Sequence, residues 1–247
     1  FRSVMRAFRE VWVRRLTPLV EDRAEVDRGR VVEEGADAAS HLLSMVIRAI
    51  DYTPPIDVQF SDFLSALLTA DAELYPDDRR YRYREALVSS CAAYGIHPVK
   101  TQSHGAWDPP RHAAKISLAR NHFESLKHDA DEAFAFVWEN QKLLELHPEA
   151  YTWVSSVRPV TRVDVDGFTL RETVAEYVQS LSLRARELRA FGIKAPKGMP
   201  GDTRVRLNGG GVLVFDEFGR LKFHIGSGVR SQKQTDRLEA LWQSGFY

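Results

Sequence analysis

The stretch from Ala36 to Asp71, ADAASHLLSMVIRAIDYTPPIDVQFSDFLSALLTAD, constrains the fold of this chain more than any other. Two segments with apolar residues at helical spacing flank the corner Tyr52-Thr53-Pro54-Pro55. Proline lacks a backbone donor and biases the preceding residue away from the helical conformation, so the first helix must end at this corner. The stretch therefore predicts two helices, joined by a rigid corner, at the centre of a helical domain.

Four helical patterns occupy the first hundred residues. We expect helices over about 2–16, where Thr17-Pro18 ends the helix or bends the chain, and over about 29–50. A third follows an N-cap at Asp57 or Ser61, and a fourth covers 79–94, with Gly95 just beyond its end. The residues predicted to face the core are Val4, Phe8, Val11, Trp12, Leu16, Val32, Ala36, Ala39, Leu43, Val46, Ile47, Ile50, Phe60, Phe63, Leu64, Leu67, Leu68, Tyr83, Leu87, Val88 and Cys91.

The pattern changes after the fourth helix. Residues 96–111 are rich in His, Pro, Gly and Ser, which indicates a boundary, and a helical pair follows at about 111–126 and 130–146. Its second half should bury Phe134, Val137, Trp138 and Leu144. Strands are predicted over about 154–165 and 168–183 around the turn dipeptide Asp166-Gly167, although 169–183 also fits a helix.

Two further strands, 212–215 and 221–225, flank a turn at 216–219, and a helix over 231–243 ends the chain. The predicted fold class is α+β: a mainly helical N-terminal bundle, then helices and a small antiparallel β-sheet region. The predicted organisation is a helical lobe at 1–97, a linker and helical pair at 98–150, and a small α+β region at 151–247.

The composition of the chain argues against two classes of binding partner. Lys plus Arg equals Asp plus Glu, 34 each among 247 residues, so no global charge favours nucleic acid or an anionic membrane. No apolar run approaches the length of a membrane-spanning helix. The single cysteine, Cys91, cannot form an internal disulfide, which favours a cytoplasmic location. We therefore expect neither a nucleic-acid nor a membrane partner.

Several candidate sites have simpler explanations. Glu124, His128 and Glu132 are spaced so that one helix could present all three to a metal, but such spacing is also ordinary on a solvated helix face. The run Asn208-Gly209-Gly210-Gly211 precedes a strand rather than a helix, so a tight turn or bulge is expected instead of a phosphate loop. Cys91 lies on an apolar stripe and should be a buried small hydrophobe. The arginines at 79, 80, 82 and 84 alternate with acids, as on a solvated face.

Residues 1–98 resemble the C-terminal helical lobe of gluzincin metallopeptidases of the thermolysin and fungalysin kind, as found in bacterial metallopeptidase-like proteins. The resemblance rests on FRSVMRAFREVWVRR, on HLLSMVIRAIDYTPPIDVQFSDFLSALLTADAELYPDD and on YREALVSSCAAYGIHP. Within these, the corner at Asp51–Pro55, the segment Ala66–Tyr75 and the turn Ala92–Ile96 match the family's order of elements.

The resemblance implies a zinc peptidase whose chemistry lies elsewhere. The family holds zinc with two His and a Glu, and a second Glu activates water. The motif H-E-x-x-H does not occur in this chain, so the ligands and catalytic residues would precede Phe1. The chain would then pack against its own N-terminal catalytic lobe and form one wall of a cleft for a peptide or protein substrate, with Arg2 and Met5 near the substrate.

Two alternatives remain open. The chain begins within a helical pattern, with neither Met nor a capping residue ahead of Phe1, so we expect a fragment or a processed chain. Alternatively, it is a stand-alone interaction or regulatory module that binds another protein. A metal enzyme built on Glu124, His128 and Glu132 is the third hypothesis.

Overall fold

The computed structural model describes residues 1–21, 27–111, 116, 123–163 and 169–247, which form two compact units. The first contains residues 1–53 and 59–108, and the second contains residues 54–58 and 109–247. The predicted middle segment, 98–150, is therefore shared between the units. The mixed α+β class is confirmed, with helices in the first unit and a four-stranded antiparallel sheet in the second. None of the described helices has both the length and the apolar character needed to cross a membrane.

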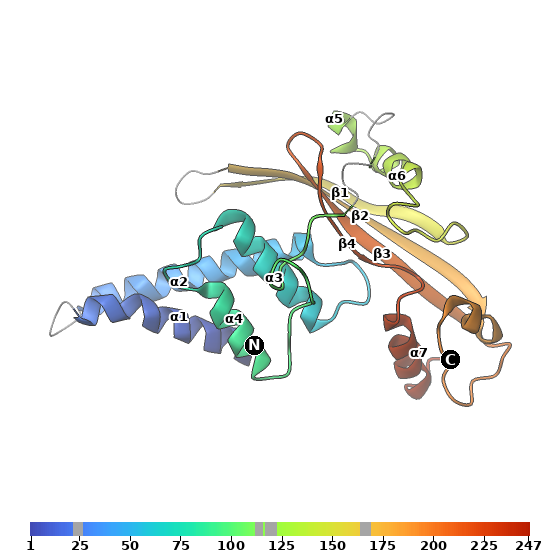
Figure 1. Ribbon diagram of the computed structural model, residues 1–247, viewed down its shortest axis with the longest axis horizontal. Helices are drawn as coiled ribbons and strands as arrows, with labels where there is room; N and C mark the ends of the chain where they lie inside the picture. Colours follow the sequence, from blue (N-terminus) through green and yellow to red (C-terminus); the bar gives the residue numbers. More distant parts are fainter. Residues whose placement is uncertain (22–26, 112–115, 117–122, 164–168) are drawn as a thin grey trace. The chain divides into compact units, whose positions relative to one another are not determined.

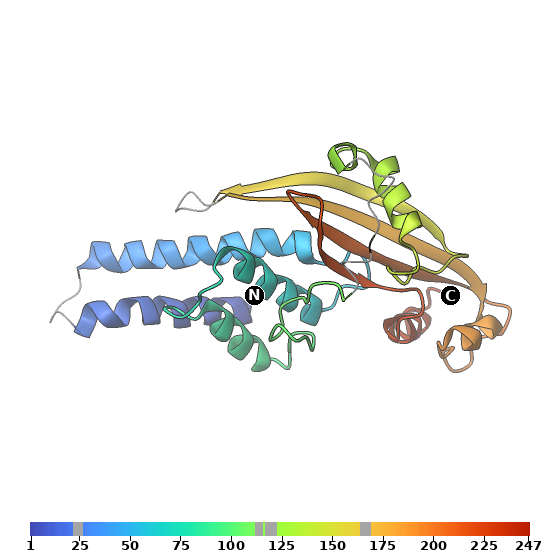
Figure 2. The ribbon, with the colours of Figure 1, turned by 45° about the horizontal axis from the view of Figure 1, so that its top comes forward.

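The first unit is built from α1 (Arg2–Glu21), α2 (Arg28–Ala49), the short 3-10 helix η1 (Ile50–Tyr52), α3 (Phe60–Leu74) and α4 (Tyr83–Ala92). The two long helices α1 and α2 run side by side in opposite directions (Figures 1 and 2). α2 starts where Asp27 accepts a hydrogen bond from the Arg30 amide. It ends at the predicted corner, where the Thr53 hydroxyl donates to the Ala49 carbonyl at 2.6 Å. Tyr52 is fully buried there.

Three predicted helix ends in this unit are wrong. α1 continues through Pro18 to Glu21, and the Thr17 hydroxyl donates to the Val13 carbonyl at 2.9 Å just before the proline. The N-cap of α3 is Gln59, and neither Asp57 nor Ser61 has this role. The backbone amide of Gln59 donates to the Asp62 carboxylate at 2.9 Å. α4 starts four residues later than predicted, since the Asp78 carboxylate accepts from the amides of Tyr83 and Arg84, both at 2.9 Å. α4 itself ends at Ala92, and the predicted glycine turn after it is confirmed: Gly95 adopts φ +71°, and the Ile96 backbone amide donates to the Cys91 carbonyl.

The predicted core face of α2 is also wrong. α2 carries two apolar stripes, and the buried one contains Ala38, Leu42, Met45 and Ala49. The predicted stripe lies outward: Val32, Leu43, Ile47 and Ile50 are each about 60% exposed. Both stripes follow helical spacing, so periodicity alone could not show which one the bundle buries. Phe60, in the first turn of α3, is likewise exposed rather than inward.

The second unit is organised around a meander of four antiparallel strands in the order β1-β2-β3-β4. The strands are β1 (Tyr151–Val163), β2 (Thr169–Arg184), β3 (Arg204–Asp216) and β4 (Leu221–Ser227). The region 169–184 is therefore a strand and not the alternative helix, and Gly219 lies in the predicted turn before β4. The Asp166-Gly167 turn lies outside the described residues. The strands are long, as Figure 2 shows, and β1 and β2 stay paired from Tyr151–Ser180 to Val163–Thr169.

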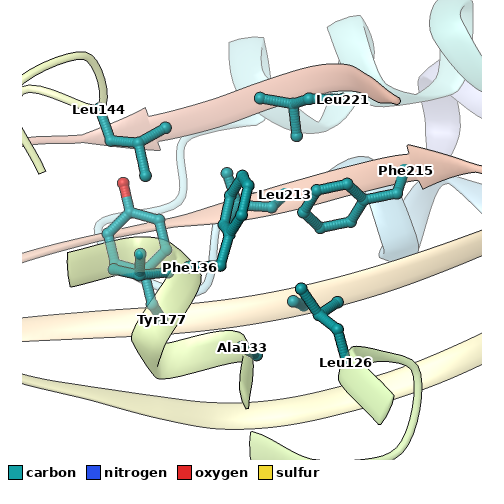
Figure 3. Packing of buried hydrophobic residues seen from close by; sticks show 10 residues of the cluster. Leu126, Ala133, Phe136, Leu144, Tyr177, Leu213, Phe215 and Leu221 are labelled. Atoms are coloured by element: carbon teal, nitrogen blue, oxygen red, sulfur yellow. The ribbon is translucent and has the colours of Figure 1, made fainter. Parts of the chain in front are cut away.

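Helices of this unit cover one face of the sheet. α5 (Phe123–Leu126) and α6 (Ala130–Glu139) pack Leu126 and Phe136 onto Leu213 and Phe215 of β3 (Figure 3). α6 is shorter than predicted because the buried Asn140 side chain donates to the Phe136 carbonyl and ends it. Val137 and Leu144 are buried as predicted, whereas Trp138 is 46% exposed. Most of the predicted helix at 111–126 lies outside the described residues.

The run Asn208–Gly211 lies inside β3, and the predicted turn or bulge is wrong. A Cβ on Gly211 would lie 2.9 Å from the Tyr177 hydroxyl, and one on Gly210 would lie 2.6 Å from the Tyr177 carbonyl oxygen. The glycines therefore allow β2 and the Tyr177 side chain to approach β3 closely.

Beyond the end of β4, the edge of β3 is closed by side chains. The 3-10 helix η3 (Ala185–Phe191) connects β2 to β3, and α7 (Lys233–Gln243) follows β4. The fully buried Gln234 amide accepts from the Asn208 amide at 3.3 Å and donates to its carbonyl at 2.7 Å. Arg237 donates to the Arg206 carbonyl at 3.0 Å. These bonds replace those of a neighbouring strand, so the edge is not left unpaired.

Candidate functional site

An apolar pocket lies at the first turn of α1. Its volume is about 400 Å³, and its walls come from α1, α3 and the end of α4. α3 contributes a stripe at three- and four-residue spacing, while the turn after α4 contributes Tyr94 and Ile96. The lining residues are Phe1, Arg2, Ser3, Val4, Phe60, Phe63, Leu64, Leu67, Cys91, Tyr94 and Ile96.

Large apolar side chains at the rim of this pocket remain exposed. Phe60 is 77% exposed and Tyr94 is 53% exposed. Of the two residues predicted to lie near a substrate, Arg2 lines the pocket, whereas Met5 does not line it and is 45% exposed on α1. An exposed group of large apolar side chains around a hollow is typical of a surface that binds a peptide, a ligand or another protein.

Cys91 lies at the base of the pocket and is a poor nucleophile. It is only 6% exposed, as predicted for an apolar helix face. Burial raises the pKa of its thiol, an effect that exceeds the opposing hydrogen bond with Ser3. A reactive cysteine requires the opposite shift of its pKa. The pocket is therefore suited to binding rather than to covalent chemistry at Cys91.

The outward stripe of α2 is a second apolar surface of the helical unit. Val32, Leu43, Ile47 and Ile50 are each more than half exposed, and they extend over most of the helix. Single exposed apolar residues are common, but a continuous stripe on a 22-residue helix is not. This surface has the pattern of a helix face that another folded element covers.

A buried polar network joins α2, α3 and α4. His41 Nε2 lies 2.7 Å from Asp71 Oδ1, and Arg84 Nη1 lies 3.3 Å from Asp71 Oδ2. Both faces of the His41 ring are stacked, on Tyr75 at 4.3 Å and on Tyr83 at 4.0 Å between ring centroids. Only 17% of the His41 side chain is exposed. A His–carboxylate pair also occurs in catalytic triads, but these stacked rings leave little room for a substrate beside the imidazole. The network's role is to hold three helices together.

Sequence patterns did not reveal this network, although one signal existed. His41 and Asp71 are polar residues near the two ends of the Ala36–Asp71 stretch, and each lies next to an apolar stripe of a predicted helix. A polar residue on the inward side of a predicted helix requires a partner. Which partner it meets depends on how the helices pack.

The candidate metal site, which was the weakest of the three hypotheses, does not lie on one helix face. α5 ends at Leu126, and Asp129 caps the separate helix α6, so Glu124, His128 and Glu132 do not share a helix. Glu124 pairs instead with Lys127 at 2.7 Å. Within the described ranges, no three His, Cys, Asp or Glu side chains are placed to hold a metal ion together.

The sheet unit buries a pair of titratable side chains. The Tyr177 hydroxyl lies 2.7 Å from His224 Nε2. Burial lowers the pKa of His224 to about 4 and raises the pKa of Tyr177. His224 is therefore neutral at pH 7 and accepts the hydrogen bond from the tyrosine hydroxyl.

Comparisons with family models, curated proteins and solved structures found no match to this chain.

Proposed function

We propose that this chain is the C-terminal, non-catalytic part of a zinc-metallopeptidase-like protein and that its apolar pocket forms one wall of a peptide-binding cleft. The observation that carries the proposal is the position of the pocket. It lies at the first turn of α1, beside Arg2, where the resemblance to gluzincin metallopeptidases places the substrate. The order of α1, the Tyr52–Pro55 corner, α3, α4 and the Gly95 turn supports the same relationship.

The proposal assigns the chemistry to residues outside this chain. The sequence does not contain the motif H-E-x-x-H, so the proposal places the zinc ligands ahead of this segment. The exposed stripe of α2 supplies a surface on which an N-terminal catalytic lobe would pack, and burial of such a stripe would stabilise that contact. The lone, buried Cys91 supports action in the cytoplasm.

Peptide binding tests the role of the pocket. We expect the chain to bind a fluorescent peptide that carries Phe or Leu side chains, and we expect Phe60→Ser to weaken binding by about fivefold, because a contact with an exposed aromatic ring is lost. Phe218→Ser is the matched control, since Phe218 is 71% exposed in the turn before β4 and belongs to the other unit. Equal affinities of both variants and the unchanged chain would exclude the pocket as the binding site.

Metal analysis of the protein purified from its native source tests the family. We expect one zinc ion per molecule, together with a polypeptide that carries the metal ligands ahead of the segment described here. A native protein without zinc would contradict the assignment, whatever the peptide measurements show.

The exposed stripe of α2 also favours an alternative, in which the chain is an interaction or regulatory module without enzymatic activity. In that case the stripe binds a different protein. Leu43→Glu and Ile47→Glu would then abolish co-purification of a stable partner, and the complex formed by the unchanged chain would show no peptidase activity. Peptidase activity in that complex would exclude the alternative.

A further inference from the structure

Three arginines meet on one face of the sheet, at the end where β2 stops and β3 begins. Arg184 pairs directly with Arg204, and Arg206 pairs with Ser182 on the same face. Side chains of directly paired residues lie about 5 Å apart, and like charges in this position repel each other. All three arginines are exposed. Their arrangement therefore lowers stability unless an anion lies between them.

The protein provides little compensating charge at this place. None of the three guanidinium groups forms an ion pair in the part of the chain that the structure describes. Glu187 is the one acid among the residues that line the pocket, against four arginines, and its carboxylate also accepts a hydrogen bond from the Arg184 backbone amide at 2.6 Å. A fourth arginine, Arg237, pairs with Asp57 at 3.4 Å. Residues 184–206 contain seven Lys or Arg and two Asp or Glu, so the balanced charge of the whole chain hides a basic region.

The arginines surround a pocket of about 720 Å³, a volume in the range of small-molecule sites. Ser182 and Asn208 add a hydroxyl and an amide to its wall. The aromatic rings of Phe246 and Tyr247 form another part, with Phe246 72% exposed and the two rings nearly perpendicular. The pocket thus combines forked cationic donors with an open aromatic face.

We propose that this pocket binds a nucleotide: its phosphate groups lie among Arg184, Arg204 and Arg206, and its base stacks on Phe246. Guanidinium groups form paired hydrogen bonds with phosphate oxygens, and a bound phosphate relieves the repulsion between the opposed arginines. Stacking of a base on an aromatic ring accepts any base. This site is in the sheet unit and does not depend on the proposed function of the helical unit.

The same chemistry suits a free nucleotide or one nucleotide of a single strand. Tyr151 and Trp153 lie on this face of the sheet, because they pair with Ser180 and Val178. They are 73% and 36% exposed, and their rings lie 5.5 Å apart. A single strand would place further bases on them, whereas a free nucleotide whose base stacks on Phe246 has no second base to place there.

Calorimetric and fluorescence-anisotropy titrations test the proposal with three probes: ATP, inorganic tripolyphosphate and a labelled single-stranded oligonucleotide. We expect ATP to bind more tightly than tripolyphosphate, and we expect Phe246→Ala to remove that difference.

The double variant Arg184→Gln/Arg204→Gln should lose about tenfold or more in affinity for ATP. Its thermal stability should be unchanged or higher, because two opposed charges are removed. If the oligonucleotide binds more tightly than ATP and Trp153→Ala removes this advantage, the natural ligand is a single strand. If Trp153→Ala leaves the affinity for the oligonucleotide unchanged, the natural ligand is a free nucleotide.

A matched control separates the pocket from general charge. Arg186→Gln/Arg189→Gln removes the same charge from exposed positions of η3 that do not line the pocket. This variant should retain its affinity for ATP. The proposal is overturned if the two double variants lose affinity equally, if tripolyphosphate binds as tightly as ATP, or if neither probe binds.

Discussion

At the scale of single residues, burial changes the chemistry of titratable side chains in this protein. His224 and Tyr177 are adjacent in space although 47 residues separate them, and neither carries a sequence signal for its partner. Cys91 was predicted to be buried from its place on an apolar stripe, and the structure confirms it. The difference is that helical periodicity reports the burial of one residue, whereas a pair across a sheet depends on the register of the strands.

Stability should fall with acid because of His224. The pKa of its imidazole is about 4 in the folded chain, below the ordinary value of 6.5, so the unfolded state binds the proton first. The stabilising contribution is complete above pH 6.5 and is lost as the pH falls toward 4. Its upper limit is about 3 kcal/mol in the free energy of unfolding. Urea unfolding at about pH 7, 6 and 5 measures this.

A variant comparison isolates the effect. His224→Leu should have a smaller dependence of stability on pH over that interval, while His97→Leu, at an exposed position, should keep the dependence of the unchanged chain. The same slope in His224→Leu and in the unchanged chain would show that another group is responsible.

Cys91 should react slowly with a thiol reagent. Burial restricts access to the thiol and raises its pKa, which lowers the fraction of thiolate. In native protein, the disulfide reagent DTNB should label Cys91 more than about tenfold more slowly than in guanidinium chloride. Labelling at equal rates under both conditions would contradict this account of the pocket's base.

At the scale of elements, the helices of the first unit are joined by the network around Asp71. Its carboxylate contacts His41 of α2 and Arg84 of α4 from a position in α3. The side chain of Asp71 is fully buried, so removing its charge leaves the buried end of Arg84 without the carboxylate that pairs with it. Packing of the apolar stripes brings these helices together, and the network fixes their relative positions.

Asp71→Asn should lower the free energy of unfolding by about 3 kcal/mol, at the lower end of the range for a broken buried ion pair. Arg84 keeps hydrogen bonds to the Tyr75 and Pro76 carbonyls, which limits the loss. Asp77→Asn is the control, because Asp77 is 71% exposed in its pair with Arg79 and should change stability by less than about 0.5 kcal/mol. Denaturant unfolding of both variants gives the comparison. A loss as small as that of Asp77→Asn would mean that Asp71 does not hold these helices.

At the scale of the whole molecule, the two units carry different candidate binding surfaces. The helical unit carries an apolar pocket and the outward stripe of α2, and the sheet unit carries the basic pocket. Total charge is zero, so composition gave no indication of the basic pocket. The opposed pair Arg184 and Arg204 is 20 residues apart in sequence and becomes a pair only through the register of β2 and β3.

Local patterns in the sequence predicted the α+β class, the Tyr52–Pro55 corner and the Gly95 turn, because these depend on proline and glycine chemistry and on local periodicity, whereas the pairing of β2 with β3 was not predicted. Which of the two apolar stripes of α2 is buried follows from the packing of the helices and not from local spacing. Tertiary packing also makes Asn208–Gly211 continue a strand beside Tyr177, and it places Glu124 in α5, Glu132 in α6 and His128 in the connection between them. These features depend on contacts between distant residues, whose energies a local pattern does not contain.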